Sequence, residues 1–104
     1  MPTKKQNATK ALEILETAWK TKSAILLTDD YVYMIFQMGP GKWQEASFIF
    51  NDGSLEVREL DAEKALMLLI EEVTTGLPGY SSYTVITDND TKSKAVERIK
   101  AAGT

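Results

Sequence analysis

Alternating apolar and polar positions between residues 24 and 60 predict four β-strands that follow one another as a meander. The runs 24–28, 31–38, 43–51 and 54–60 are rich in β-branched and aromatic side chains, which favour strands. Because only a few residues separate each run from the next, we expect neighbouring strands to pair antiparallel.

Three short segments mark the turns of this meander. Two aspartates at 29–30 predict a tight hairpin, since short polar side chains tolerate turn dihedrals. The Asp-Gly pair at 52–53 predicts a two-residue turn of the type that needs positive φ. Gly-Pro-Gly at 39–41 cannot continue a strand, and we expect a loop of about five residues over 39–43.

The turns also assign each strand residue to one of two faces, because side chains alternate along a strand. One face is apolar in both hairpins, and we call it the core face: Ile25, Leu27, Val32, Met34, Phe36, Met38, Phe48, Phe50, Leu55 and Val57. The opposite, outer face carries Ala24, Leu26, Tyr31, Tyr33 and Ile35 from the first hairpin, and Glu45, Ser47, Ile49, Glu56 and Arg58 from the second.

The first half of the outer face is apolar and aromatic, whereas the second half is polar enough to lie in solvent. Two interpretations of the apolar half are open: a helix covers it, or it is an exposed patch for a partner. Trp43 lies at its border, either in an exposed loop or folded back beside Tyr33 and Ile35. Tryptophan is enriched at binding hot spots, so Trp43 is a candidate contact residue in both cases.

Three further segments have the spacing of amphipathic helices. The first ends near residue 21 and begins either at Thr3, in a capping box with Gln6, or at Asn7. Its apolar stripe is Ala8, Ala11, Leu12, Leu15, Ala18 and Trp19. The last helix is predicted over 91–102, capped by residues 88–90, with the stripe Ala95, Val96, Ile99 and Ala102.

The middle helix follows Asp61 and has the stripe Ala62, Leu66, Leu69 and Val73. It is apolar nearly all round, so we expect it to lie over the core face with part of it reaching another helix or a partner. Gly76 predicts its end, and a short strand from about residue 83 follows.

These elements predict an α+β fold in the order α-β-β-β-β-α-β-α. We expect a two-layer sandwich with a mainly antiparallel sheet of four to five strands and helices packed on it. Residues 1–6 are predicted to be a flexible basic N-terminus and residues 7–104 a single domain. The position and direction of the fifth strand are left open by the pattern.

The 104 residues include no cysteine and no histidine. The chain therefore lacks disulfides, thiolate chemistry, the commonest general base and the commonest transition-metal ligand. We accordingly expect a non-enzymatic protein with no catalytic residue, cofactor or metal. No run resembles a signal peptide or a membrane span, so we expect a cytoplasmic protein without a membrane partner.

Two motifs resemble ligand sites but lack residues that such sites need. Residues 39–42 look like a fragment of a phosphate-binding loop, yet Phe36 and Trp43 stand where glycine and Ser or Thr are required. Residues 88–90 begin like a calcium loop without its later ligands, and helix capping explains them. An acidic magnesium site on the sheet matches no recognisable spacing either.

The net charge of −3 hides an uneven distribution along the chain. Residues 1–22 carry five lysines against two glutamates, whereas residues 44–72 carry eight acidic residues against two basic ones. The basic N-terminus and stacking by Tyr31 and Tyr33 would support nucleic-acid binding as an alternative function. The basic residues of the last helix would contribute to it: Lys92, Lys94, Arg98 and Lys100. Against it, the chain is acidic overall and no basic residue lies among the sheet aromatics.

The function that we expect is a small protein–protein interaction module, such as a regulator, an inhibitor or an adaptor. Its contact surface would combine the aromatic outer face with an acidic stretch: Tyr31, Tyr33, Ile35, Trp43, Glu56, Glu59 and Glu63. A homodimer through this face or through the sheet edge is a close variant.

Overall fold

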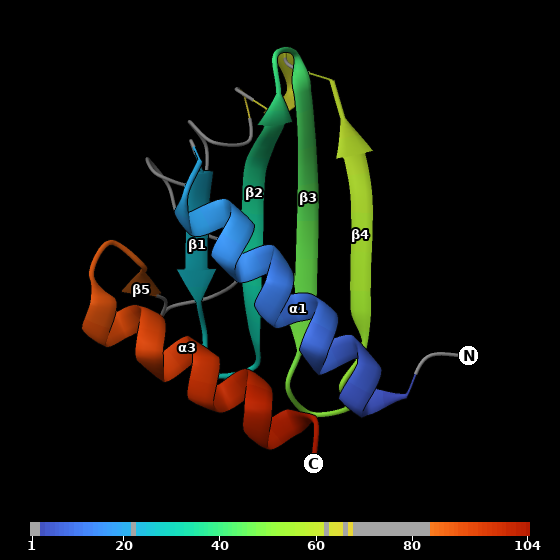
Figure 1. The fold of residues 1–104 in the computed structure, drawn as a ribbon, viewed down its shortest axis with the longest axis vertical. Coiled ribbons are helices and arrows are strands. Elements are labelled where there is room, and N and C mark those ends of the chain that lie inside the picture. Colours follow the sequence, from blue (N-terminus) through green and yellow to red (C-terminus); the bar gives the residue numbers. More distant parts are fainter. Residues whose placement is uncertain (1–2, 22, 62, 66, 68–83) are drawn as a thin grey trace.

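The computed structural model describes residues 3–21, 23–61, 63–65, 67 and 84–104, which form a five-stranded antiparallel sheet with helices packed on it (Figure 1). The elements are α1 (Lys4–Trp19), β1 (Ser23–Leu27), β2 (Tyr31–Gly39), β3 (Lys42–Ile49), β4 (Leu55–Leu60), β5 (Thr84–Val85) and α3 (Asn89–Ala102). Between β4 and β5, the described residues 63–65 and 67 are helical. The predicted α+β fold and the order of its elements are confirmed.

The strands lie in the order β4-β3-β2-β1-β5, so the meander forms one continuous block and β5 joins its far edge. β5 pairs antiparallel with β1, through Leu26 opposite Val85 and Leu27 opposite Thr84. This pairing fixes the position and direction of the fifth strand. β4 forms the other edge of the sheet.

The predicted division into two faces is confirmed by the strand register. Met34 of β2 lies opposite Ala46 of β3, and the next residue, Ile35, lies opposite Glu45. The core face therefore carries Val32, Met34, Phe36 and Phe48, all of which are buried. Figure 1 shows both long helices on one side of the sheet, with α1 crossing the strands obliquely and α3 beside it.

Two turns are shorter or longer than the sequence predicted, yet the faces are unchanged. The strands β2 and β3 are joined by a tight turn at Pro40 and Gly41, where Gly41 has a φ of +69° that suits glycine. The β3–β4 connection spans residues 50–53, because Ile49 N–H donates to the Ser54 carbonyl at 3.0 Å. Each register differs from the prediction by two positions, and a shift of two keeps every side chain on its face.

A bulge at Met38 makes this register possible. The pairing changes step between Gln37 and Gly39, so that Gln37 lies opposite Trp43 and Gly39 lies opposite Lys42. The extra residue moves β3 by one position, which places its polar residues on the outer face. Met38 was predicted on the core face, but its side chain is 52% exposed at the bulge.

Side chains cap both long helices. The Thr3 side chain accepts a hydrogen bond from Gln6 N–H, and the Gln6 side chain accepts one from Thr3 N–H, which is the predicted capping box. Lys4, Lys5 and Gln6, predicted to belong to a flexible N-terminus, form the first turn of α1. α3 begins at Asn89, where Asp88 accepts from Thr91 N–H at 2.7 Å. Within the described residues, no helix is long and apolar enough to cross a membrane.

The middle helical segment differs from the prediction, because its described core residue packs on the outer face. Ala65 is fully buried in a cluster with Ala24, Leu26, Tyr33 and Ile35. α1 and α3 already fill the core face, so the outer face offers this segment the remaining apolar surface. The rest of its predicted stripe, Ala62, Leu66, Leu69 and Val73, and the predicted end at Gly76 lie outside the described residues.

Candidate protein-interaction surface

The aromatic outer face is not an exposed patch. Tyr33 is 8% exposed and Ile35 is 0% exposed, so the expectation that these two side chains lie at the surface is wrong. The physical reason is the cluster around Ala65, which removes them from solvent. Tyr31 and Trp43 are half-buried at the margin of this cluster. The acidic residues of the predicted surface are exposed: Glu56, Glu59 and Glu63.

Glu45 is buried rather than solvated, and two partners on the outer face satisfy its carboxylate. The Tyr33 hydroxyl donates a short hydrogen bond to Glu45 Oε2. Arg58 donates to Glu45 Oε1 from Nε at 3.1 Å and from Nη2 at 2.6 Å. These hydrogen bonds to Glu45, together with its charge, raise the pKa of Arg58. A buried carboxylate needs such partners, so Tyr33 has a structural role here.

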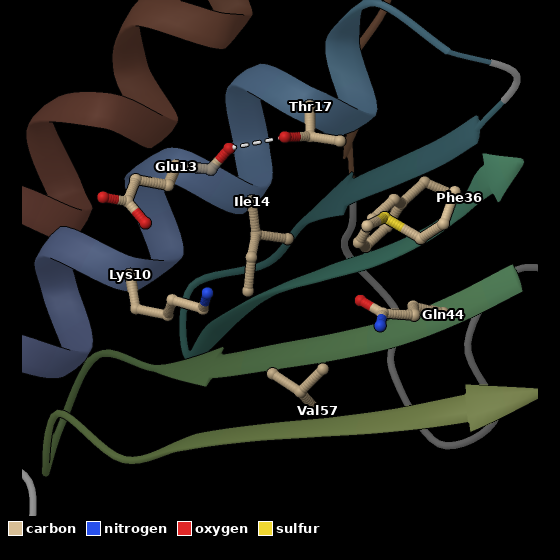
Figure 2. A pocket seen from close by; sticks show the side chains of 8 residues that line it. Lys10, Glu13, Ile14, Thr17, Phe36, Gln44 and Val57 are labelled. Atoms are coloured by element: carbon tan, nitrogen blue, oxygen red, sulfur yellow. Dashed lines mark hydrogen bonds between the residues drawn. The ribbon is translucent and has the colours of Figure 1, made fainter.

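A groove opens on the core face between α1 and the strands β2, β3 and β4, with a cavity volume of about 270 Å³. We call it the α1–β4 groove. Figure 2 shows Ile14 reaching from α1 toward the sheet and Val57 reaching from β4 toward the helix. Val57 is 41% exposed, which is unusual for a side chain in the alternating core pattern. The lining residues are Lys10, Glu13, Ile14, Thr17, Phe36, Met38, Gln44 and Val57.

The oblique path of α1 explains why this groove is open. In Figure 1, the helix runs from the β4 side at its N-terminus to the β1 side at its C-terminus. It therefore covers only part of β3 and β4, which agrees with the partial exposure of Val57. The polar rim comes from α1, where Thr17 donates to the Glu13 carbonyl at 3.1 Å (Figure 2). Among the described residues, Lys10 forms no salt bridge.

A second pocket, which we call the Trp43 pocket, adjoins the groove at the end of the β2–β3 hairpin. Its cavity volume is about 460 Å³. Met38 and Gln44 line both cavities, so the two cavities lie side by side, and we call them together the groove surface. The structure thus brings together two residues of the predicted surface, Trp43 and Glu59. The lining residues are Met38, Gly41, Lys42, Trp43, Gln44, Glu59 and Leu60.

The sequence did not identify the apolar part of this surface. Val57 and Phe36 were predicted as core, and Met38 was predicted beside them. Their place beside an opening depends on two tertiary features, namely that β4 is an edge strand and that α1 crosses the sheet obliquely. Glu56 and Glu63 line neither cavity.

Two of the basic residues in α3 are engaged within the chain. Lys92 Nζ lies 2.6 Å from Glu16 Oε1 and 5.3 Å from the centre of the Trp19 ring. Arg98 donates to the Asp29 carbonyl at 2.5 Å and stacks 4.5 Å from the centre of the Phe50 ring. Lys94 and Lys100 remain exposed. The basic helix therefore offers a nucleic acid fewer available charges than the sequence predicted.

The groove surface combines apolar side chains with polar and charged ones, as binding surfaces for other proteins do. In the part of the chain that the structure describes, no group of histidine, cysteine, aspartate or glutamate side chains could hold a metal ion. Comparison of the chain with protein-family models, with curated proteins and with solved structures gave no match.

Proposed function

We propose that this chain is a small non-enzymatic protein–protein interaction module, acting as a regulator, an inhibitor or an adaptor. The partner would place an apolar segment in the α1–β4 groove and the adjoining Trp43 pocket. The observation that carries the proposal is the exposure of Val57 and Met38 beside two adjacent cavities, the first of which is also lined by the buried Phe36. A cytoplasmic setting belongs to this proposal, and a sequence without cysteine is compatible with it.

The magnitudes favour apolar contacts over charged ones at this surface. Complete burial of a Val or Met side chain contributes about 1.5–3 kcal/mol, and roughly half of that is still available at Val57 and at Met38. An exposed ion pair with Lys10 or Glu59 at the rim would contribute only about 0–1 kcal/mol. We therefore expect binding that depends weakly on salt concentration.

Nucleic-acid binding is the alternative that the same experiments address. It would need the lysines of α1 and α3, and it predicts an affinity that falls steeply as salt is added. The burial of Tyr33 and the contacts of Lys92 and Arg98 weigh against it.

The first test compares a groove variant with a matched control. Met38→Ser removes an exposed apolar side chain from both cavities, whereas Met67→Ser makes the same change at a side chain that is 65% exposed and lines neither. Both variants are first checked for folding by circular dichroism. Nuclease-treated lysate is then passed over each immobilised protein, and a captured protein is purified and titrated.

We expect Met38→Ser to weaken binding of the purified partner about tenfold, equivalent to about 1.4 kcal/mol, and Met67→Ser to leave it unchanged. NMR chemical shifts should move at Ile14 and Phe36 when the partner is added. Equal binding by wild type and Met38→Ser would overturn the proposed surface. A labelled oligonucleotide that binds in place of a protein, with steep salt dependence, would favour the alternative.

A further inference from the structure

Among the described residues, the edge of β4 that faces away from β3 has no strand beside it, and this edge is a second candidate binding feature. Ile49 N–H points to β4 and Phe50 N–H points to Asp30 on the other side, so the backbone groups of β3 alternate between its neighbours. Following the register from Ile49, Glu56 and Arg58 direct their backbone groups toward β3. Leu55, Val57 and Glu59 therefore direct theirs away from the sheet, on the side where the strands that the structure describes include no neighbour of β4.

We propose that a second copy of this chain pairs with this edge, antiparallel and about a two-fold axis at Val57. The backbone N–H and C=O groups of Leu55, Val57 and Glu59 would then bond to those of Glu59, Val57 and Leu55 of the other copy. The two sheets would form one continuous sheet with both α1 helices on the same side. The inference does not rest on the proposed function of the groove.

The side chains of β4 favour this register over its neighbours. With the axis at Val57, Glu56 lies opposite Arg58 of the second copy and Arg58 lies opposite Glu56, and opposite charges across strands stabilise a pair. Val57 lies opposite Val57, which buries a side chain that is 41% exposed in the single chain. Arg58 is 71% exposed and can reach a second carboxylate while it holds Glu45.

Shifting the axis by one residue in either direction removes this complementarity. An axis at Glu56 places two glutamates opposite each other, and an axis at Arg58 places two arginines opposite each other. Charges on an edge strand normally prevent pairing with other strands. In β4, the charges of Glu56 and Arg58 disfavour the two neighbouring registers and favour the register with the axis at Val57. The contact is a strand of six residues, so we expect a weak, concentration-dependent dimer.

A single-cysteine experiment tests the register directly, because the natural sequence has no cysteine. In an antiparallel hydrogen-bonded pair, the Cα atoms lie about 5.5 Å apart, within the range that a disulfide spans. Val57→Cys should therefore form a disulfide-linked dimer under mild oxidation. Leu55→Cys should not, because each Leu55 lies opposite Glu59 and far from the other Leu55. The double variant Leu55→Cys/Glu59→Cys should cross-link again.

Sedimentation of the wild-type chain provides the second measurement. We expect a dimer whose dissociation constant rises at least tenfold in Glu56→Lys, which faces Arg58 of the second copy. The control Glu63→Lys makes the same charge change off β4 and should leave the dimer intact. A wild-type chain that stays monomeric up to about 1 mM, or equal cross-linking at positions 55 and 57, would overturn the proposal.

Hydrogen exchange of the backbone amides would show whether a different protein, rather than a second copy of the chain, pairs with the edge of β4. Protection of the outward amides of Val57 and Glu59 only when a different protein is present would assign the edge to that protein and overturn the dimer. The groove test uses Met38 and the edge test uses Glu56 and the single cysteines. Either proposal can therefore fail while the other stands.

Discussion

The carboxylate of Glu45 shows how one buried charge fixes its neighbours. It lies on the outer face of β3 and accepts hydrogen bonds from Tyr33 and Arg58. Arg58 is mostly exposed, so solvent screens its contribution, whereas Tyr33 and Glu45 are both buried. Loss of the Tyr33 hydroxyl should therefore destabilise the buried carboxylate more than loss of Arg58.

We expect Tyr33→Phe to lower the free energy of unfolding by about 1–3 kcal/mol, because a buried charged acceptor loses a donor. Urea denaturation measures this change. The control is the same substitution in a Glu45→Gln background, where the acceptor is neutral and the loss should fall to about 1 kcal/mol. An equal loss in both backgrounds would show that the effect of Tyr33 does not come from the carboxylate.

The sequence could place these residues but could not describe their contacts. Alternation put Tyr33, Glu45 and Arg58 on one face, and the register confirms it. The pattern took Glu45 as solvated because a glutamate is rarely buried. Its burial goes with two side-chain contacts, from Tyr33 and from Arg58, that the pattern did not show. Trp43 and Glu59 were likewise predicted for the binding surface, but not the cavity that joins them.

At the scale of elements, the turns decide how much of the sheet could be predicted. Asp-Gly at 52–53 and Gly-Pro-Gly at 39–41 marked the connections, although each actual connection differs in length from the prediction. Each error shifts the pairing of two strands by two positions, and side chains on a strand return to the same face every two residues. The predicted face of each side chain was therefore correct, but the predicted residue opposite it in β2–β3 and β3–β4 was not. The bulge at Met38 carries no distinctive residue, so no sequence signal predicted it.

The cap of α3 leads to a prediction about pH. The Thr91 backbone N–H donates to Asp88 and lowers the pKa of this carboxyl, with the Thr91 side chain as a second cause. A lowered pKa in the folded state stabilises the protein above the pKa of the unfolded chain, which is about 3.9 for aspartate. This contribution is lost as the pH falls through the folded value.

Asp88→Asn keeps a capping side chain but cannot ionise, so it provides the comparison. We expect wild type to have the higher melting temperature at pH 7 and the difference to shrink as the pH falls below about 4. Thermal unfolding followed by circular dichroism over this range measures it. A difference that stays constant with pH would mean that the charge of Asp88 has no part in capping α3.

For the whole molecule, the main feature is a sheet with buried apolar residues on both faces. Phe48 and Met34 lie in the cluster under α1 and α3, and Ile35 and Leu26 lie in the cluster with Ala65. The sequence left both a covered and an exposed outer face open. It could not decide between them, because an apolar strand face has the same pattern whether its cover is a helix or another protein.

Adjacent residues of β2 test this two-sided burial. Met34 and Ile35 are each 0% exposed and point to opposite faces. We expect both Met34→Ala and Ile35→Ala to lower the free energy of unfolding by about 2–5 kcal/mol, as measured by urea denaturation. A cost below about 0.5 kcal/mol for Ile35→Ala, the usual effect at a surface position, would contradict the burial of the outer face.

The positions of the two tryptophans have a consequence for spectroscopy. Trp19 packs against the cluster under α1 and α3, beside Lys92, whereas Trp43 packs against the cluster on the other face. The chain has no other tryptophan, so its tryptophan fluorescence has one emitter on each side of the sheet. Replacing either one by phenylalanine leaves a protein whose emission reports on a single side. The two tryptophans can therefore report whether the clusters on the two faces of the sheet unfold together or one after the other.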